Sequence, residues 1–270
     1  MRYWPLLFIV SVASCSSPQF TEVLVTKKQV IYSEHVQDSF ELYITLPKKY
    51  STTSSHPVVY YLDANLKSGK ALRKVINQKE LAGDTVQTIF IGIGHIGNYR
   101  VLRRRDFVTP HIQQGDSLYS DETNYGHAQN FYSFLSYELI PLIERNYGVS
   151  KKRTLIGHSF GGLFAFYSLF QKEQLFQNYV ALSPSLWVND GNIYYFEKKY
   201  RKDSAAIDAT LFMRAGSRET INKILGACNS MNDFLNKKPY SNLQIDYKIL
   251  EGETHNSYVE KSLSEIVNKL

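Results

Sequence analysis

The feature that most constrains this chain is the pentapeptide GHSFG at positions 157–161. In a G-x-S-x-G pattern a strand turns sharply into a helix and leaves the serine hydroxyl exposed. The flanking glycines are needed because a Cβ atom would clash where the strand and the helix fold closely together. The surroundings agree, since a short apolar run at 154–156 precedes the motif and a longer one at 163–170 follows it. We therefore predict a strand–turn–helix unit with Ser159 at the turn.

Apolar runs of strand length alternate with amphipathic segments along most of the chain. The first three are expected to be antiparallel opening strands, and the compact β-branched runs that follow are typical of buried parallel strands. The runs lie at 23–25, 30–32, 40–46, 58–62, 88–91, 154–156, 179–182, 211–213 and 245–250. Helical patterns occupy 131–143, 160–170 and 258–270. The alternation predicts an α/β fold with a mainly parallel central sheet of about eight strands and helices on both faces.

Length and composition fit one large domain over 22–270. Of the 270 residues 43% are hydrophobic, which is enough for a sizeable core. Two cysteines can form neither a disulfide framework nor a four-thiolate zinc site, and we expect Cys228 to be buried. One segment, about 95–127, has neither the helix nor the strand period and follows a strand end, so we expect an inserted substrate loop there.

A serine hydroxyl becomes a nucleophile only when a base accepts its proton. Only one histidine follows Ser159 in the sequence, His255, which comes after the last predicted strand. An acid that orients this histidine is expected after the strand at 211–213, where Glu219 stands. Asp190, Asp208 and Glu253 are competing acids, and a Ser–His dyad without an acid is a further alternative.

A tetrahedral oxyanion needs two backbone N–H groups aimed at it. The first is expected from Phe160, directly after the serine. The second is expected from the loop after Leu62, where Ala64 is our candidate.

The N-terminus has the pattern of an export signal. A basic residue, an apolar stretch and small residues precede Cys15, and the stretch is shorter than the roughly 20 residues that span a bilayer. The cysteine after small residues resembles the lipobox of bacterial lipoproteins. We predict a lipoprotein signal peptide at 1–14, lipid attachment at Cys15 and a tether at 15–21. Because Ser16 and Ser17 are not acidic, we expect an outer-membrane anchor facing the periplasm; an ordinary signal peptide or a buried first strand remain alternatives.

Several motifs together resemble the enterochelin (siderophore) esterase-like branch of the esterase D superfamily of α/β-hydrolases. The resemblance runs from about residue 40 to the C-terminus and rests on short motifs in addition to the GHSFG turn at 157–161, which is called the nucleophile elbow. These are YYLD at 60–63, IGIG at 91–94, RRRDF at 103–107, SPSLW at 183–187 and GETH at 252–255. Ala64, where the family more often has glycine, and Val108, which is an extra residue between Phe107 and Thr109, depart from the pattern, and both lie in expected substrate loops.

The resemblance implies an α/β-hydrolase fold and the catalytic set Ser159, His255 and Glu219. It also implies that Arg105 and Trp187 line the substrate cleft, and we add Asp63 to the substrate-binding residues. From charge alone, the run at 103–105 is open to two interpretations: a solvated turn paired with Asp106, or a receptor for an anionic substrate.

Other classes of ligand are not indicated. The sequence GIGHIG at 92–97 fits G-x-G-x-x-G, but a basic stretch that we expect to be non-helical follows it, so we predict no dinucleotide site. His95, His111 and His127 lack a metal-ligand spacing, and we expect exposed loop histidines, no metal and no cofactor. The net charge of +6 is spread along the chain, which does not indicate nucleic acid.

We therefore expect a serine esterase that cleaves carboxylic esters through an acyl-enzyme, with a ferric-siderophore ester as the first substrate hypothesis. A polysaccharide acetyl or feruloyl esterase and an acyltransferase are the alternatives, and a non-catalytic binding lipoprotein is a third.

Overall fold

The computed structural model describes residues 24–84, 87–112, 118–119, 125–221 and 223–270. The predicted signal peptide at 1–14, Cys15 and the tether at 15–21 lie outside these described residues. Within them, no helix is both long and apolar enough to cross a membrane.

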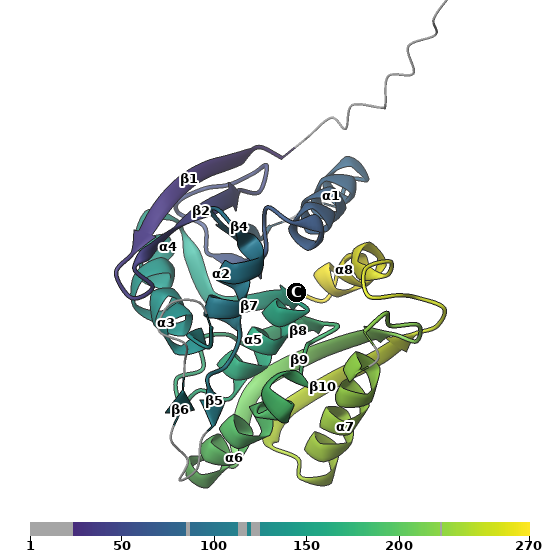
Figure 1. Ribbon diagram of the computed structural model, residues 1–270. Helices are drawn as coiled ribbons and strands as arrows, with labels where there is room; N and C mark the ends of the chain where they lie inside the picture. The colour runs from purple at the N-terminus through teal and green to yellow at the C-terminus, as the bar shows by residue number, and fades with distance from the viewer. Residues whose placement is uncertain (1–23, 85–86, 113–117, 120–124, 222) are drawn as a thin grey trace, which may run out of the picture.

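An eight-stranded sheet forms the centre of the fold, as predicted (Figure 1). Its spatial order is β1-β2-β4-β3-β7-β8-β9-β10. β1 and β2 form an antiparallel edge hairpin, β2 pairs antiparallel with β4, and the other pairs are parallel. The strands are β1 (Thr26–Ser33), β2 (Asp38–Thr45), β3 (His56–Leu62), β4 (Ile89–His95), β7 (Val149–His158), β8 (Asn178–Leu182), β9 (Ala206–Gly216) and β10 (Ser241–Leu250).

Helices cover both faces of this sheet. Successive side chains of a strand point to opposite faces, so each parallel strand contributes to two cores. The smaller core holds Tyr61 and packs against α1 (Lys67–Leu81) and α8 (Val259–Val267), which lie side by side in Figure 1. The larger core holds Tyr60 and packs against the remaining helices. These are α2 (Tyr99–Phe107), α3 (Ala128–Ser133), the π-helical turn η2 (Phe134–Leu139), α4 (Ile140–Asn146), α5 (Phe160–Leu169), α6 (Ile193–Asp203) and α7 (Lys223–Lys237); a short 3₁₀ turn, η3 (Val188–Gly191), precedes α6.

The segment 95–127 is more regular than expected. It contains α2 and a two-stranded ribbon of β5 (His111–Ile112) and β6 (Leu118–Tyr119). The Asn98 side chain caps α2 by accepting a hydrogen bond from the N–H of Arg100. The prediction of a non-helical stretch is therefore wrong, because the contacts that stabilise this short helix come from residues distant in sequence.

The strand directions bring the predicted site residues together. The C-terminal ends of β3, β7, β8, β9 and β10 meet at one edge of the sheet. The loops that follow these ends carry Asp63, Ser159, Ser183, Glu219 and His255. This edge is where open α/β sheets form their ligand sites.

Candidate active site

Ser159 occupies a strained turn between β7 and α5. Its backbone angles are φ 59° and ψ −115°, and residues other than glycine rarely adopt a positive φ of this kind. A Cβ atom on Gly157 would lie 2.0 Å from the carbonyl oxygen of Gly161, so only glycine fits there. The Ser159 hydroxyl lies 3.3 Å from that of Ser185 and borders a cavity of about 270 Å³. The predicted strand–turn–helix unit is confirmed, and its turn presents the serine to this cavity.

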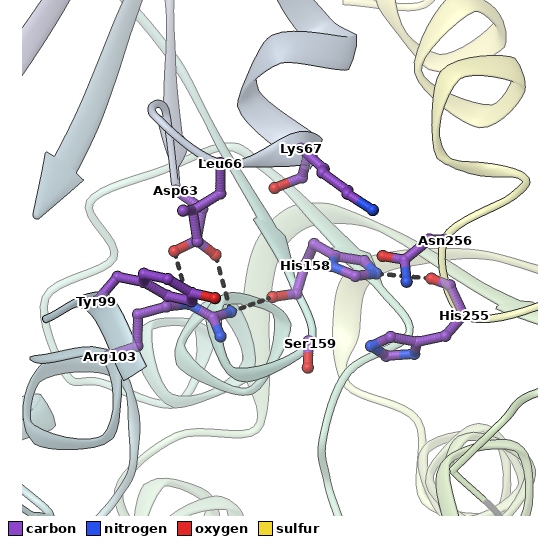
Figure 2. A pocket seen from close by; sticks show the side chains of 10 residues that line it. Asp63, Leu66, Lys67, Tyr99, Arg103, His158, Ser159, His255 and Asn256 are labelled. Atoms are coloured by element: carbon purple, nitrogen blue, oxygen red, sulfur yellow. Dashed lines mark hydrogen bonds and ion pairs between the residues drawn. The ribbon is translucent and has the colours of Figure 1, made fainter. Parts of the chain in front are cut away.

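His255 lines the same cavity and extends toward Ser159 (Figure 2). Its Nδ1 donates a hydrogen bond of 2.8 Å to Oε2 of Glu219. Because a carboxylate can only accept, Nδ1 carries the hydrogen and Nε2 is left as the basic nitrogen. The structure thus brings the predicted base and the predicted acid into direct contact.

Glu219 is held in an ionised state. Its other oxygen accepts a 2.5 Å hydrogen bond from the Ser183 hydroxyl and a 3.1 Å bond from the N–H of Gly216. Burial alone would raise the pKa of Glu219, but the hydrogen bonds from His255, Ser183 and Gly216 outweigh burial and hold the pKa below its usual value. Of the competing acids, Asp190 and Asp208 are exposed and Glu253 accepts from Ser257, whereas Glu219 contacts the histidine.

His158 is a buried histidine beside the site that the sequence analysis did not assign. Its Nε2 donates to the main-chain oxygen of His255 at 2.8 Å, and the two rings lie 4.6 Å apart. Burial, with a further contribution from the neighbouring His255, lowers the pKa of His158 to about 4. The ring is therefore neutral at ordinary pH, and it fixes the main chain that carries His255. The motif itself was the available signal, because it places a histidine next to the serine.

Of the two predicted oxyanion donors, the N–H of Phe160 is available and that of Ala64 is not. The N–H of Phe160 stands at the first turn of α5, where backbone donors have no partner within the helix. The N–H of Ala64, in contrast, donates to the carbonyl oxygen of Ile93 at 3.0 Å. The prediction that Ala64 supplies the second donor is therefore wrong, because β4 takes up that amide. The next residue, Asn65, has the candidate N–H in this loop, since the N–H of Leu66 donates to Asp63.

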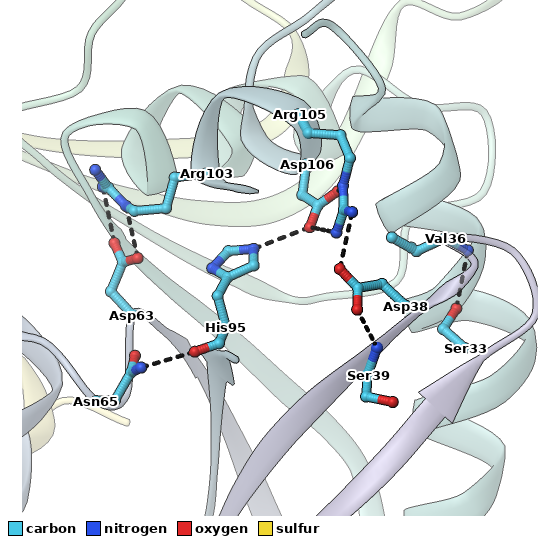
Figure 3. A network of polar contacts seen from close by, with 10 residues as sticks. All are labelled: Ser33, Val36, Asp38, Ser39, Asp63, Asn65, His95, Arg103, Arg105 and Asp106. Carbon is cyan, nitrogen blue, oxygen red and sulfur yellow. Dashed lines mark hydrogen bonds and ion pairs between the residues drawn. The ribbon is translucent and has the colours of Figure 1, made fainter. Parts of the chain in front are cut away.

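Arg105 forms ion pairs inside the protein, whereas Arg103 lies at the cavity, which is the reverse of the predicted substrate contact. Arg105 binds Asp106 through two N–H groups, at 2.7 and 2.9 Å, and Asp38 through a third, at 2.9 Å (Figure 3). His95 also bonds Asp106, which is fully buried. Arg105 is absent from the residues that line the cavity, so the prediction of a substrate contact is wrong and pairing with Asp106 is confirmed. The arginine that borders the cavity is Arg103.

The cavity lining shows which of the other predicted residues meet it. Asp63 does so, although its carboxylate is bound by Arg103 at 2.7 and 2.9 Å (Figure 2). Trp187 is not among the residues that line this cavity; its indole packs against the core, with the Lys223 ammonium 5.5 Å from the ring centre. The structure therefore does not place Trp187 beside Ser159, and its contact with substrate stays a prediction. Besides His158, sequence reasoning missed five residues that line the cavity: Leu66, Lys67, Ser68, Tyr99 and Asn256.

The glycine-rich and histidine-rich features have structural roles. A helix begins at Tyr99, whereas we predicted no dinucleotide site because we expected a non-helical stretch after GIGHIG. However, a Cβ atom on Gly92 would lie 2.3 Å from the ring of Tyr61, so this glycine makes room for a side chain of the protein itself. His95 is buried rather than exposed, while His111 is exposed as expected. The described residues contain no group of three or more His, Cys, Asp or Glu arranged to hold a metal ion. Cys228 is buried, as predicted, and burial raises the pKa of its thiol.

Fold and site together define a serine hydrolase of the α/β-hydrolase class, and comparison with known proteins identifies the family. The profile of the family described as "Putative esterase" matches residues 33–264. The chain belongs to this esterase family and is a carboxylic ester hydrolase.

Individual relatives agree. The ferri-bacillibactin esterase BesA of Bacillus subtilis is 31% identical over 221 residues, which cover 77% of this chain and 74% of the relative. The crystal structure of the BES protein from Bacillus cereus superposes with a TM-score of 0.73 at 28% identity, covering 90% of this chain and 94% of that one. The siderophore hydrolase EstB from Aspergillus nidulans shares the fold, with a TM-score of 0.75 at 20% identity and 97% of each chain covered.

Proposed function

We propose that this protein hydrolyses the ester bonds of a ferric siderophore, with Ser159, His255 and Glu219 as its catalytic residues. The observation that carries the proposal is the placement of Ser159 and His255 on one cavity, with His255 bonded at 2.8 Å to Glu219. The relatives named above as a ferri-bacillibactin esterase and a siderophore hydrolase support this class of substrate.

In the proposed mechanism Ser159 attacks the ester carbonyl while Nε2 of His255 takes the hydroxyl proton. Glu219 stabilises the imidazolium that forms, and the N–H groups of Phe160 and Asn65 bind the oxyanion. The alcohol leaves with the proton from His255. Water, activated by the same nitrogen, then cleaves the acyl-enzyme and restores the serine.

The cavity mouth supports an anionic, aromatic substrate. Lys67 is exposed in the first turn of α1 and lines the cavity. Tyr99, the first residue of α2, lines another side of it (Figure 2). Arg103 is already neutralised by Asp63. Lys67 therefore supplies the cation, and Tyr99 a ring face, for an iron complex that carries negative charge on aromatic groups.

The cell-envelope location is part of the same proposal. Cys15 follows the small residues of the predicted signal peptide and would carry the lipid, anchoring the protein to the outer membrane on its periplasmic side. Incorporation of labelled fatty acid into the parent, and its loss from a Cys15→Ala variant, test the anchor separately from the chemistry. Label in neither protein would contradict it.

The deciding experiment compares three esters at equal concentration: a ferric triester siderophore, a feruloylated sugar and an acetylated sugar. The proposal expects the highest kcat/KM for the siderophore. Preference for either sugar would contradict it and favour a polysaccharide acyl esterase. Adding an alcohol acceptor extends the test, because a hydrolase yields mainly the free acid, whereas an acyltransferase would yield mainly a new ester.

A further inference from the structure

Arg103 connects two loops that are far apart in sequence. From α2, its Nε and Nη2 donate to the two oxygens of Asp63 at 2.7 and 2.9 Å, and Nη2 also donates to the carbonyl oxygen of His158 at 3.2 Å (Figure 2). The guanidinium carbon lies 5.5 Å from the centre of the Phe160 ring. One side chain thus contacts the loop after β3 and both neighbours of Ser159.

These are the two loops that supply the proposed oxyanion donors. Asp63 lies two residues before the N–H of Asn65, and His158 lies two residues before the N–H of Phe160. The loops belong to adjacent strands, but the chain between them runs through α1, α2 and several other elements. The separation of the two donors therefore depends on non-covalent contacts across the site, and Arg103 supplies hydrogen bonds to both loops.

Backbone strain is a second feature that the two loops share. Asp63 has φ 57° and Ser159 has φ 59°, so both loops hold a residue in the left-handed region. Conformations of this kind persist only where the surroundings hold them. The Asp63 side chain is 2% exposed and that of Arg103 13%, so the ion pair is shielded from water and its planar, two-point geometry is well defined.

We propose that Arg103 is a positioning residue that holds the two halves of the oxyanion hole at a fixed separation. This inference rests on the proposed function, because it takes Ser159 as the nucleophile. It differs from a role in binding anionic substrate, which the position of Arg103 at the cavity also suggests. Positioning acts on every ester, whereas anion binding acts on charged substrates alone.

The test uses Arg103→Lys with a neutral ester, p-nitrophenyl butyrate, and with a ferric triester siderophore. A lysine keeps the charge but cannot form the two-point bond to Asp63 and also reach His158. Misplacing one oxyanion donor costs roughly 10- to 100-fold in rate. We expect kcat to fall by about this factor for both esters, with KM for the neutral ester within about twofold of the parent value. An unchanged kcat, or a rise in KM confined to the anionic ester, would overturn the inference.

Two further variants guard against trivial results. Asp63→Asn keeps a residue that tolerates positive φ but removes the charge that holds the arginine, and it should lower kcat in the same way. Arg104→Lys is the matched control, because Arg104 is exposed on the same helix, and it should behave as the parent. Thermal unfolding identifies variants that fail to fold, and Asp63→Asn with parental melting and parental kcat would also overturn the inference. If Ser159→Ala keeps full activity, the proposed function fails. If Ser159→Ala loses activity while a folded Arg103→Lys protein keeps the parental activity, only the inference about Arg103 fails.

Discussion

The imidazole of His158 donates a hydrogen bond from Nε2 to the main-chain carbonyl oxygen of His255, 2.8 Å away. The nucleophile's neighbour on β7 therefore holds the loop that carries the base. Because burial keeps His158 neutral, its ring adds no second positive charge when His255 is protonated during catalysis. A single buried side chain thus relates the positions of two catalytic groups that are 96 residues apart in sequence.

This buried histidine predicts a specific dependence of stability on pH. The folded pKa of about 4 lies below the ordinary value of 6.5, so the unfolded chain binds more protons between these values. The stabilisation is present above pH 6.5 and is lost as the pH falls toward 4. From pH 7 to pH 5 this residue should reduce the free energy of unfolding by about 2 kcal/mol. Denaturant titrations of the parent and His158→Asn at both pH values check this, and equal losses in the two proteins would refute it.

Ser183→Ala should weaken the triad through its acid. The Ser183 hydroxyl donates to Glu219 and lies 2.5 Å from the hydroxyl of Tyr258. Without this donor the pKa of Glu219 rises, so less of it is ionised in mild acid. We expect kcat/KM at pH 7 to fall about 3- to 10-fold, as for the loss of a charged hydrogen bond, and the acid limb of the pH profile to move to higher pH. Tyr258→Phe should give a smaller shift in the same direction. An acid limb that stays in place in Ser183→Ala would contradict this role.

Arg105→Met should affect stability and spare substrate binding. The change leaves the fully buried Asp106 with His95 as its remaining side-chain partner, and breaking a buried ion pair costs about 3 kcal/mol or more. We expect a lower melting temperature with parental KM for a ferric siderophore, while Arg104→Met keeps both values. A raised KM with parental melting would instead restore the substrate role that the sequence suggested.

Lys67→Ala should affect anionic substrates alone. An exposed charge contact contributes up to about 1 kcal/mol, so KM for a ferric siderophore should rise about three- to fivefold at low salt. The difference from the parent should shrink as salt is added. For neutral p-nitrophenyl butyrate the two proteins should match, and Lys70→Ala, on the exposed part of α1, serves as the control. Equal effects on both esters would contradict a charge contact.

The sequence predicts those parts of the fold and of the site that have a signal in the local pattern of residues. The strands, the elbow and the buried helix α5 follow from periodicity and glycine placement. His255 follows from being the only histidine after Ser159, and Glu219 from the strand that precedes it.

The errors arise where a contact joins residues far apart in the chain. Helix α2 carries few apolar residues, and its arginines are stabilised by Asp63 and Asp38, 40 and 67 positions away. Ala64 looked like an oxyanion donor because its partner, the carbonyl of Ile93 on β4, is visible only in the fold. The Asn98 cap was the one local sign of α2.

The most direct test of the central claim is the reaction of the full chain with a fluorophosphonate, followed by peptide mapping and by assay of Ser159→Ala on a ferric triester siderophore. We predict one adduct, on the peptide that contains Ser159, and at least a thousandfold loss of siderophore hydrolysis in the variant, on the order of what loss of a triad member costs. A folded Ser159→Ala protein that hydrolyses the siderophore at the parental rate would contradict it.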